Sequence, residues 1–194
     1  MKYILGIFFA CALALTAPLS IASDQSEQLV LTQTSLGPLQ LAKNAKVSVS
    51  LLKILFPSLL VKYEIGQGDS PDFHYFEVQD KKGTVLFSIK SFIDETTAVK
   101  RTSTNVPMHL LRIASPTIRD EYGLHVGDNV KDVIAKRGES LSVSAMHHDI
   151  ALGSKDIYYS IETSGESPES FTLKDAVEGN WKVRFITWPE PAWE

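Results

Sequence analysis

The chain has 194 residues, 44% of them hydrophobic, and its 19 lysines and arginines against 23 aspartates and glutamates give a formal charge of −4. This scattered negative charge argues against a nucleic-acid partner, because phosphate binding needs a basic face. The one cysteine, Cys11, lies in the first apolar run, so the rest of the chain has no disulfide or thiolate chemistry.

The segment 1–22 has the features of a cleaved secretory signal peptide. Lys2 precedes the apolar run YILGIFFACALALTA, which is shorter than the roughly 20 residues that span a bilayer. Ser20 and Ala22 are the small residues that a signal peptidase needs before a cut at Ser23. We therefore expect export to the periplasm or to the outer membrane.

The remaining residues, 23–194, are enough for a single domain with its own core.

Lipidation of Cys11 would require a lipobox, in which an aliphatic residue stands three positions before the cysteine. Here Phe8-Phe9-Ala10 precedes it, and the apolar run continues beyond it. We expect no lipid anchor.

The first elements predicted after the signal are a strand and a helix. QLVLTQT, 28–34, alternates apolar and polar residues as a half-buried strand does, and the Gly37-Pro38 pair marks a turn. A helix follows and must end near Pro57, which has no amide donor. Its apolar face, three or four residues apart, consists of Val49, Leu52, Leu55, Phe56 and Leu59.

A meander of three strands comes next, at 59–65, 73–79 and 84–90. These runs are rich in β-branched and aromatic residues, and the turn-forming sequences GQGDSPD and DKKG separate them. Links this short favour antiparallel pairing. The polar stretch 91–107 is predicted to connect the two halves of the chain.

The stretch YGLHVGDNVKDVIAKRG, 122–138, predicts a brief strand between Gly123 and Gly127 and then a short helix. Either glycine could take a positive φ. Asp128 or Asn129 could cap the helix, and Gly138 is the residue expected just past its end. The apolar stripe consists of Val130, Val133 and Ile134. The Asp128 carboxylate at the cap repels anions, so we interpret this stretch as a structural helix and not as a phosphate-binding turn.

Further strands are predicted at 109–115, 140–146, 156–162 and 181–188, with Trp188 packed into the core at the last strand's end. Residues 164–180 form a long polar loop before the last strand. The fold class is α+β, a mainly antiparallel sheet with two short helices. Because helix followed by three strands occurs twice, two similar halves, 28–90 and 108–188, are an open alternative.

Three stretches of the sequence resemble a known family, the RpoE-regulated lipoproteins of Gram-negative envelopes. IRDEYGLHVGDNVKDVIAKRG is similar to the family's glycine-flanked segment and helix. DIYYSIETSGESPESFTLKDAVEGNWKVRFITW is similar to its loop and closing strand, and LGPLQL through HYFEVQD is more weakly similar to its first half. Two departures are the missing lipobox and Ser167, which separates Glu166 from Pro168. The resemblance implies an envelope protein of unestablished biochemical function and supplies no catalytic residue.

MHHDI is the one local cluster suited to metal binding. In a strand, alternate residues share a face, so His147 and Asp149 would point together. That supplies two ligands where a stable zinc site needs three or four, and His74, His109 or His125 would have to be gathered by folding to complete it. A small metal-dependent hydrolase built on this pair is one alternative function.

We find no nucleophile elbow, nucleotide loop or pair of carboxylates held apart, and we expect no enzyme activity and no cofactor. The leading hypothesis is a non-catalytic accessory protein that binds an envelope protein or a cell-wall component. The candidate partner contacts are Glu166, Pro168 and Trp193, in the long loop and in the proline-stiffened end of the chain. An inhibitor of a cell-wall enzyme is a further alternative, by analogy alone.

Overall fold

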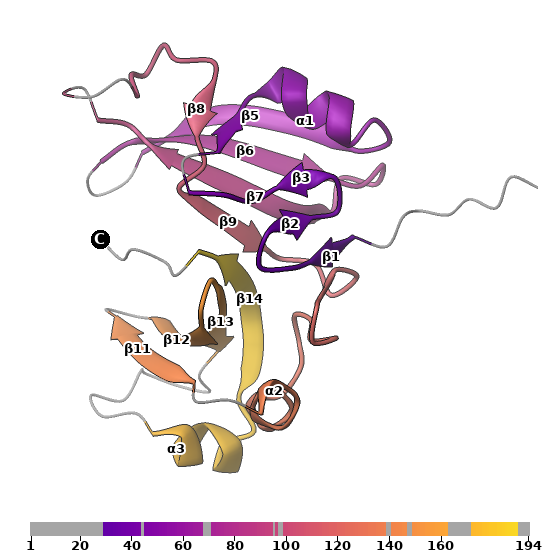
Figure 1. Ribbon diagram of the computed structural model, residues 1–194, viewed down its shortest axis with the longest axis vertical. Helices are drawn as coiled ribbons and strands as arrows, with labels where there is room; N and C mark the ends of the chain where they lie inside the picture. Colours follow the sequence, from indigo (N-terminus) through magenta and orange to yellow (C-terminus); the bar gives the residue numbers. More distant parts are fainter. Residues whose placement is uncertain are drawn as a thin grey trace, which may run out of the picture.

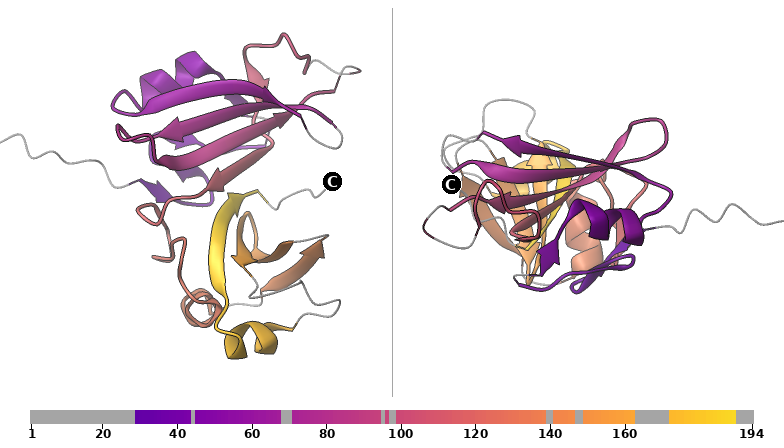
Figure 2. Two further views of the ribbon diagram at one scale, coloured as in Figure 1. Left: turned by 180° about the vertical axis from the view of Figure 1, so that it is seen from behind. Right: turned by 90° about the horizontal axis from the view of Figure 1, so that it is seen from above.

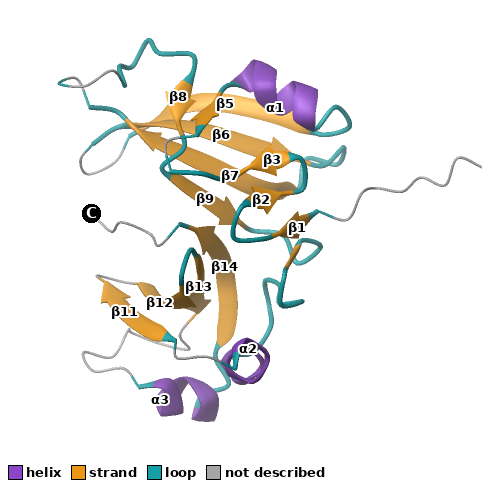
Figure 3. Ribbon diagram, viewed as in Figure 1, coloured by secondary structure: helices purple, strands orange, loops and turns teal. Residues whose placement is uncertain are grey.

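The structure, a computed structural model, describes residues 29–43, 45–67, 71–94, 96, 99–138, 141–146, 149–162 and 172–189, without the side chains of 144–149. Its three helices are α1 (Val49–Leu55), α2 (Val130–Arg137) and α3 (Leu173–Glu178). Its longer strands are β5 (Leu60–Gly66), β6 (Phe73–Gln79), β7 (Val85–Phe92), β9 (Leu110–Ile113), β11 (Ser142–Met146), β12 (Asp149–Ser154), β13 (Ile157–Glu162) and β14 (Lys182–Trp188). The predicted α+β class is confirmed (Figure 3).

These eight strands form one sheet in the order β11-β12-β13-β14-β9-β7-β6-β5, and every neighbouring pair is antiparallel. The central pair, β9 and β14, joins strands that lie far apart in the sequence. Figure 1 shows the sheet turning there, so that β5–β7 form its upper part and β11–β13 its lower part. No helix in the described part of the chain is long and apolar enough to cross a membrane.

Six shorter strands form two small sheets beside the large one. The four-stranded sheet has the order β10-β1-β2-β3, in which β10 and β1 are parallel, and β4 pairs with β8. These strands are β1 (Val30–Leu31), β2 (Ser35–Leu36), β3 (Leu39–Gln40), β4 (Lys46–Val47), β8 (Val106–Pro107) and β10 (Arg119–Asp120). Figure 2 shows the four-stranded small sheet and α1 on the same side of the upper strands of the large sheet.

Helix α1 forms where the apolar spacing predicts it. The Ser48 side chain accepts a hydrogen bond from the backbone N–H of Leu51 and caps the first turn. Leu52 is fully buried, and the Phe56 ring packs edge-on against Phe87 of β7 with centroids 5.3 Å apart. The helix therefore covers the core face of β7.

The prediction of one strand over 28–34 was wrong in its extent. Strand β1 ends at Leu31, because the Thr32 hydroxyl accepts hydrogen bonds from the backbone N–H groups of Thr34 and Ser35 and turns the chain. Strands β2 and β3 then form a hairpin, with Gly37 at a φ of +52°. Polar side chains that bond to nearby backbone compete with regular pairing.

Helix α2 confirms the predicted helix, and Gly138 lies just past its end as expected, in the left-handed conformation with a φ of +58°. The brief strand predicted before it is absent, because carboxylates turn the backbone at that point. Asp120 accepts from the N–H of Leu124, and Asp128 accepts from the N–H of His125. The cap residue is Asn129, whose side chain makes no capping hydrogen bond.

Two elements of the second half were not predicted. Strand β12 lies between β11 and β13 and pairs with both. Helix α3 lies inside the predicted polar loop, so the described chain has three helices rather than two. A capping box stabilises α3: Asp175 N–H donates to the Thr172 hydroxyl, and Thr172 N–H donates to the Asp175 carboxylate.

A single core cluster joins the three helices, the small sheet and one face of the large sheet. Leu31, Leu52, Val133 and Ala176 bring side chains to it from β1, α1, α2 and α3. Trp188, at the end of β14, is buried in the core as expected, and its indole N–H donates to the carbonyl of Gln33 over 2.9 Å. The other face of the large sheet therefore receives none of these helices.

Candidate functional site

The large sheet has a second face that no described helix covers, and we call it the helix-free face. Because side chains alternate along a strand, residues next to the buried core positions point to this face. It consists of Lys62, Glu64, Phe73, Tyr75, Glu77, Ser88, Lys90, Phe92, Leu110, Arg112, Phe185, Thr187, Tyr158, Ser160, Ala151, Gly153 and Ser142. None of them belongs to the core cluster that the helices contact.

One row of directly paired residues crosses this face over all eight strands. The row runs from β5 to β11 as Lys62, Glu77, Ser88, Arg112, Thr187, Tyr158, Gly153 and Ser142. Directly opposed side chains in antiparallel pairs lie within contact distance. The row begins with an opposite-charge pair and continues through an arginine flanked by hydroxyl-bearing residues.

Aromatic rings and cations contact each other on the same face. The Lys90 ammonium lies 4.2 Å from the centroid of the Phe73 ring, and Phe73 packs edge-on against Tyr75. The guanidinium carbon of Arg112, on β9, lies 4.7 Å from the centroid of the Phe185 ring on β14, and that of Arg184, on β14 itself, lies 5.0 Å from it. Cations over aromatic faces are attracted by the ring quadrupole, and these contacts fix the rings in place.

The centre of the face carries buried hydroxyl groups. Thr187 is 2% exposed and Ser160 is 3% exposed. Neither hydroxyl oxygen has a hydrogen-bond partner among the described residues. Leaving a buried polar group unpaired costs about 1–3 kcal/mol, so such groups call for an explanation.

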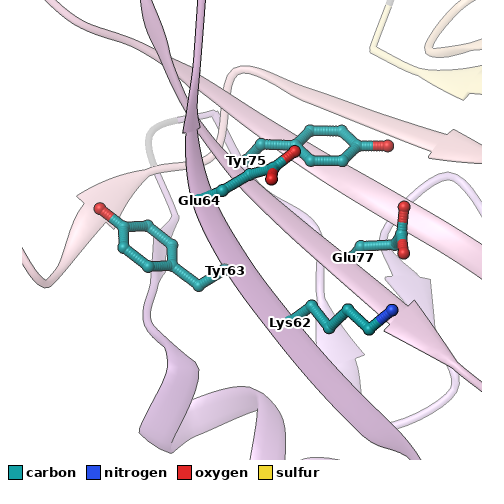
Figure 4. A pocket seen from close by; sticks show the side chains of 5 residues that line it. All are labelled: Lys62, Tyr63, Glu64, Tyr75 and Glu77. Atoms are coloured by element: carbon teal, nitrogen blue, oxygen red, sulfur yellow. The ribbon is translucent and has the colours of Figure 1, made fainter.

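A shallow depression of about 550 Å³ lies at the β5 end of the face. Figure 4 shows Lys62, Glu64, Tyr75 and Glu77 on one side of β5 and β6, with Tyr63 on the other side of β5. Four of the lining residues thus belong to the helix-free face. The depression offers both charges and a phenol ring.

Tyr63 reaches a fully buried histidine on the core side of the sheet. Its hydroxyl lies 2.9 Å from Nδ1 of His74, and Nε2 of His74 lies 2.9 Å from the carbonyl oxygen of Lys100. A carbonyl only accepts, so Nε2 carries the proton and Nδ1 accepts from Tyr63. Partial burial raises the pKa of the Tyr63 hydroxyl. Both ring nitrogens of His74 are occupied, so it holds the chain at Lys100 and is not a free base.

A second buried polar cluster lies under α2. The Tyr159 hydroxyl donates to Asp120 over 2.6 Å and accepts from Arg137 over 2.9 Å, and Arg137 also stacks over the Tyr122 ring. Burial raises the pKa of the Asp120 carboxyl, and burial together with that carboxylate raises the pKa of Tyr159. Every member of the cluster contacts another, so it is a structural brace between α2 and β13.

Of the sequence-predicted site residues, His147, Glu166, Pro168 and Trp193 lie outside the described residues. The backbone of Asp149 begins β12 and pairs with Met146, but its side chain is likewise outside. Within the described part of the chain, no three His, Cys, Asp or Glu residues gather as metal ligands.

The histidines considered as further ligands have other contacts. His74 bonds to Tyr63, as described above. His109 accepts from the N–H of Phe92 at Nδ1, and His125 lies 3.3 Å from Asp128. Burial and the neighbouring Lys46 lower the pKa of His109. These rings thus have separate structural roles.

The comparisons with known proteins bear on the fold. No family profile matches the sequence, and no curated protein matches it. The crystal structure of the uncharacterized protein yfeY from Escherichia coli resembles this one with a TM-score of 0.56 at 15% sequence identity. The likeness covers 83% of this chain and 99% of that chain. The two proteins share a fold. At this identity the likeness extends to the fold alone.

The helix-free face was missed from the sequence, although one strand carried a signal for it. FHYFEVQ places His74, Phe76 and Val78 on the core side. Phe73 and Tyr75 alternate with these residues and so point to the opposite face of the sheet, where a solvated face would carry small or charged residues. Aromatic side chains that point to both faces of an antiparallel strand indicate that both faces make contacts.

Proposed function

We propose that this protein is a non-catalytic binding module of the bacterial cell envelope and that its binding site is the helix-free face. The resemblance to the RpoE-regulated lipoproteins and the signal-like segment 1–22 support export to the periplasm or outer membrane, without a lipid anchor. Neither source assigns a reaction.

The observation that carries the proposal is the composition of a sheet face without helices. An antiparallel sheet needs to bury only one face, and the other is ordinarily polar. Here Phe73, Tyr75, Phe92 and Phe185 are all half-buried on that second face. Aromatic residues and arginine are the types enriched at protein interfaces and their energetic centres.

The partner we propose is a protein of the envelope. Small-molecule pockets are mostly apolar and enclose their ligand. The depression beside β5 is instead shallow and lined by Lys62, Glu64 and Glu77 along with two tyrosines. The half-buried aromatic rings of β6, β7 and β14 extend the face beyond this depression, which suits a protein surface better than a small molecule. The contacts predicted from the sequence, Glu166, Pro168 and Trp193, stay candidate partner contacts, and an enzyme of the cell wall is one class of protein to which the partner could belong.

Site-specific photo-cross-linking in the producing cell tests the proposal. A benzophenone amino acid replaces Tyr75 on the helix-free face or, as the matched control, exposed Lys53 on α1 at the opposite side of the sheet. We expect one discrete adduct from position 75 and none of that mass from position 53. The same adduct from both positions, or from position 53 alone, would contradict the assignment of the face.

Mass spectrometry of the adduct then distinguishes the partner classes. A protein covalently joined at position 75 supports the proposal, and a cell-wall enzyme would identify the protein as an inhibitor. An adduct that consists only of glycan or lipid would refute a protein partner. As a second arm, Tyr75→Ala combined with a cross-linker at Phe73 should lower the adduct yield, because the aromatic contact is lost.

A further inference from the structure

We propose that two copies of this chain associate through strand β5, which pairs antiparallel with its own copy across a two-fold axis at Tyr63. This adds a second interaction surface, the edge of the large sheet, to the helix-free face, and it does not depend on the proposed function. Three features of β5 carry it: its place at the sheet edge, the exposed apolar side chains there, and the order of its charges.

Strand β5 is a long and regular edge strand. It ends the eight-stranded sheet (Figure 1), and its seven residues pair with β6 without a bulge. Among the described residues, none outside β6 forms a backbone hydrogen bond with β5. Proteins usually protect such an edge with a proline, a bulge or a covering segment, because its outward N–H and C=O groups can pair with another strand. Strand β5 contains no proline and no bulge, so its edge is suited to pairing.

Apolar surface gathers at the same edge. Leu60 is 48% exposed and Tyr63 is 43% exposed, and Ile54 in helix α1, which packs beside β5, is 74% exposed. These are the three most exposed large hydrophobic side chains in the described part of the chain. Exposed apolar groups that lie together mark interaction sites. A second strand against β5 would remove part of this surface from water.

The charges of β5 are complementary to those of a second copy. In an antiparallel pair centred on Tyr63, residues at equal distances from it face each other, so Lys62 of each copy is opposite Glu64 of the other. Val61 is then opposite Ile65, and the two Tyr63 rings are opposite each other. Opposite charges, β-branched pairs and aromatic pairs all stabilise antiparallel strands, whereas parallel pairing in register would place like charges together. The charges therefore select the orientation and the register.

Both charged side chains are available to a second copy. Lys62 and Glu64 are exposed, and neither forms an ion pair or a side-chain hydrogen bond with another described residue. On β6, Glu64 is opposite Tyr75, which brings no cation, and Lys62 is opposite Glu77. The Glu77 carboxylate accepts a hydrogen bond from the side chain of Gln79 instead. The partner's β5 would thus supply ion pairs that this sheet does not.

Pairing of β5 with itself also closes the assembly. The other edge strand, β11, contains no charged residue, so β5 paired with β11 of another copy would leave Lys62 and Glu64 without partners. Head-to-tail contacts of that kind continue from copy to copy, whereas a two-fold contact is complete with two copies. Because the two-fold axis is perpendicular to the sheet, the helix-free faces of both copies lie on the same side. The dimer would therefore present the proposed binding face twice.

Analytical ultracentrifugation of purified residues 23–194, with no other protein present, tests the proposal. Edge contacts bury little surface and associate weakly, so the chain is studied from about 5 μM to about 0.5 mM. We expect a monomer–dimer equilibrium. Lys62→Glu and Glu64→Lys should each weaken dimerisation at least about tenfold, because each places like charges opposite each other. Lys131→Glu, the same charge change at an exposed position of α2, should leave it within about twofold.

A mixture of the two variants controls for folding and tests the register. When the Lys62→Glu chain pairs with the Glu64→Lys chain, opposite charges meet at both positions, so the equimolar mixture should dimerise about as tightly as the wild type. A mixture that stays monomeric while the wild type dimerises would overturn the register. A wild type that is monomeric at about 0.5 mM, or that forms assemblies larger than a dimer, would overturn the proposal.

A disulfide reports on the centre of the pair. The only cysteine is Cys11, so Tyr63→Cys gives residues 23–194 a single thiol. Directly opposed residues of antiparallel strands lie within the Cα separation that a disulfide spans. Oxidised glutathione, which is reduced as the two thiols join, should cross-link this variant at least about tenfold faster than Lys131→Cys at the same concentration. Equal rates for the two variants would overturn the pairing at Tyr63.

The outcomes separate this inference from the proposed function. In cells, an adduct from position 75 that contains only a second copy of this chain would support the dimer and refute a different protein as the partner. An adduct with a different protein, together with a purified chain that stays monomeric, would refute the dimer and leave the proposed function in place.

Discussion

The Tyr159 hydroxyl donates a 2.6 Å hydrogen bond to Oδ2 of Asp120, joining β13 to the turn before α2 inside the core. Oδ1 of the same carboxylate accepts from the backbone N–H groups of Tyr122 and Leu124. Arg137, from the last turn of α2, donates to the Tyr159 hydroxyl and to the carbonyl of Ser154. The Tyr159 hydroxyl thus links a buried cation to a buried anion, and each of them would lack one hydrogen bond without it.

Removing that hydroxyl should destabilise the fold. Tyr159→Phe keeps the ring packing but leaves Asp120 and Arg137 each one hydrogen bond short, which costs about 2 kcal/mol of unfolding free energy. Urea denaturation followed by circular dichroism measures the loss. Tyr75→Phe, on the half-exposed second face, is the control and should change stability by less than about 0.5 kcal/mol. Equal effects of the two substitutions would show that the brace contributes nothing.

The brace also predicts a pH dependence. Burial raises the pKa of the Asp120 carboxyl above its ordinary 3.8, so the native state holds this proton more tightly than the unfolded chain does. The resulting stabilisation is complete below the ordinary pKa and is lost as pH rises through the raised native pKa.

Asp120→Asn removes this titratable group. Comparing the unfolding free energies of the wild type and the variant therefore isolates the contribution of Asp120 to the pH dependence. We expect the unfolding free energy of the wild type minus that of Asp120→Asn to fall as pH rises from about 4, and then to level off. Hydrogen bonds lower the pKa of exposed Asp80 and Asp175, which gives the opposite slope in both proteins and cancels in the difference. A difference that rises with pH would contradict the assigned direction.

Much of the fold could be predicted because local signals agreed with the long-range packing. Helix α1 has its apolar spacing and its Ser48 cap, and the β5–β7 meander has clear turns. Strand β12 was missed because DIALGS contains a glycine and an alanine in place of branched residues. Helix α3 was missed because its six residues carry little periodicity, although Thr172 and Asp175 form a recognisable capping pair.

The candidate site could not be predicted, because it depends on which strands are neighbours. Arg112 and Thr187 are 75 positions apart in the sequence, and only the pairing of β9 with β14 places them opposite each other. Ser88 joins them through a further pairing, of β7 with β9. Strand order in a sheet is a long-range property that hydrophobic periodicity does not encode.

The cap of α2 gives a prediction about backbone conformation. Gly138 has a φ of +58°, and a Cβ added there would meet no atom within 4 Å. Substitution is therefore limited by the left-handed conformation alone. Gly138→Ala should lower the unfolding free energy by about 1 kcal/mol, and Gly138→Asn should cost less, because asparagine tolerates this region. Urea denaturation of both variants tests the order; a larger loss with asparagine would contradict it.

The buried His74 predicts where the chain opens first. Its Nε2–H group donates to the carbonyl of Lys100, in the connection between β7 and β9. His74→Phe keeps an aromatic ring but removes this hydrogen bond, and losing about 1 kcal/mol raises the open population of that segment about fivefold. Limited trypsin digestion followed by mass spectrometry should therefore show faster cleavage after Lys100 and Arg101.

Tyr63→Phe is the matched control for this experiment. It removes the hydroxyl that bonds to Nδ1 of His74 but leaves the bond from Nε2 to Lys100 in place. Cleavage after Lys100 should therefore stay within about twofold of the wild-type rate. Equal acceleration by both variants would mean that the hydrogen bond between Tyr63 and His74 matters as much as the one to Lys100, so the connection would not depend on the single hydrogen bond to Lys100.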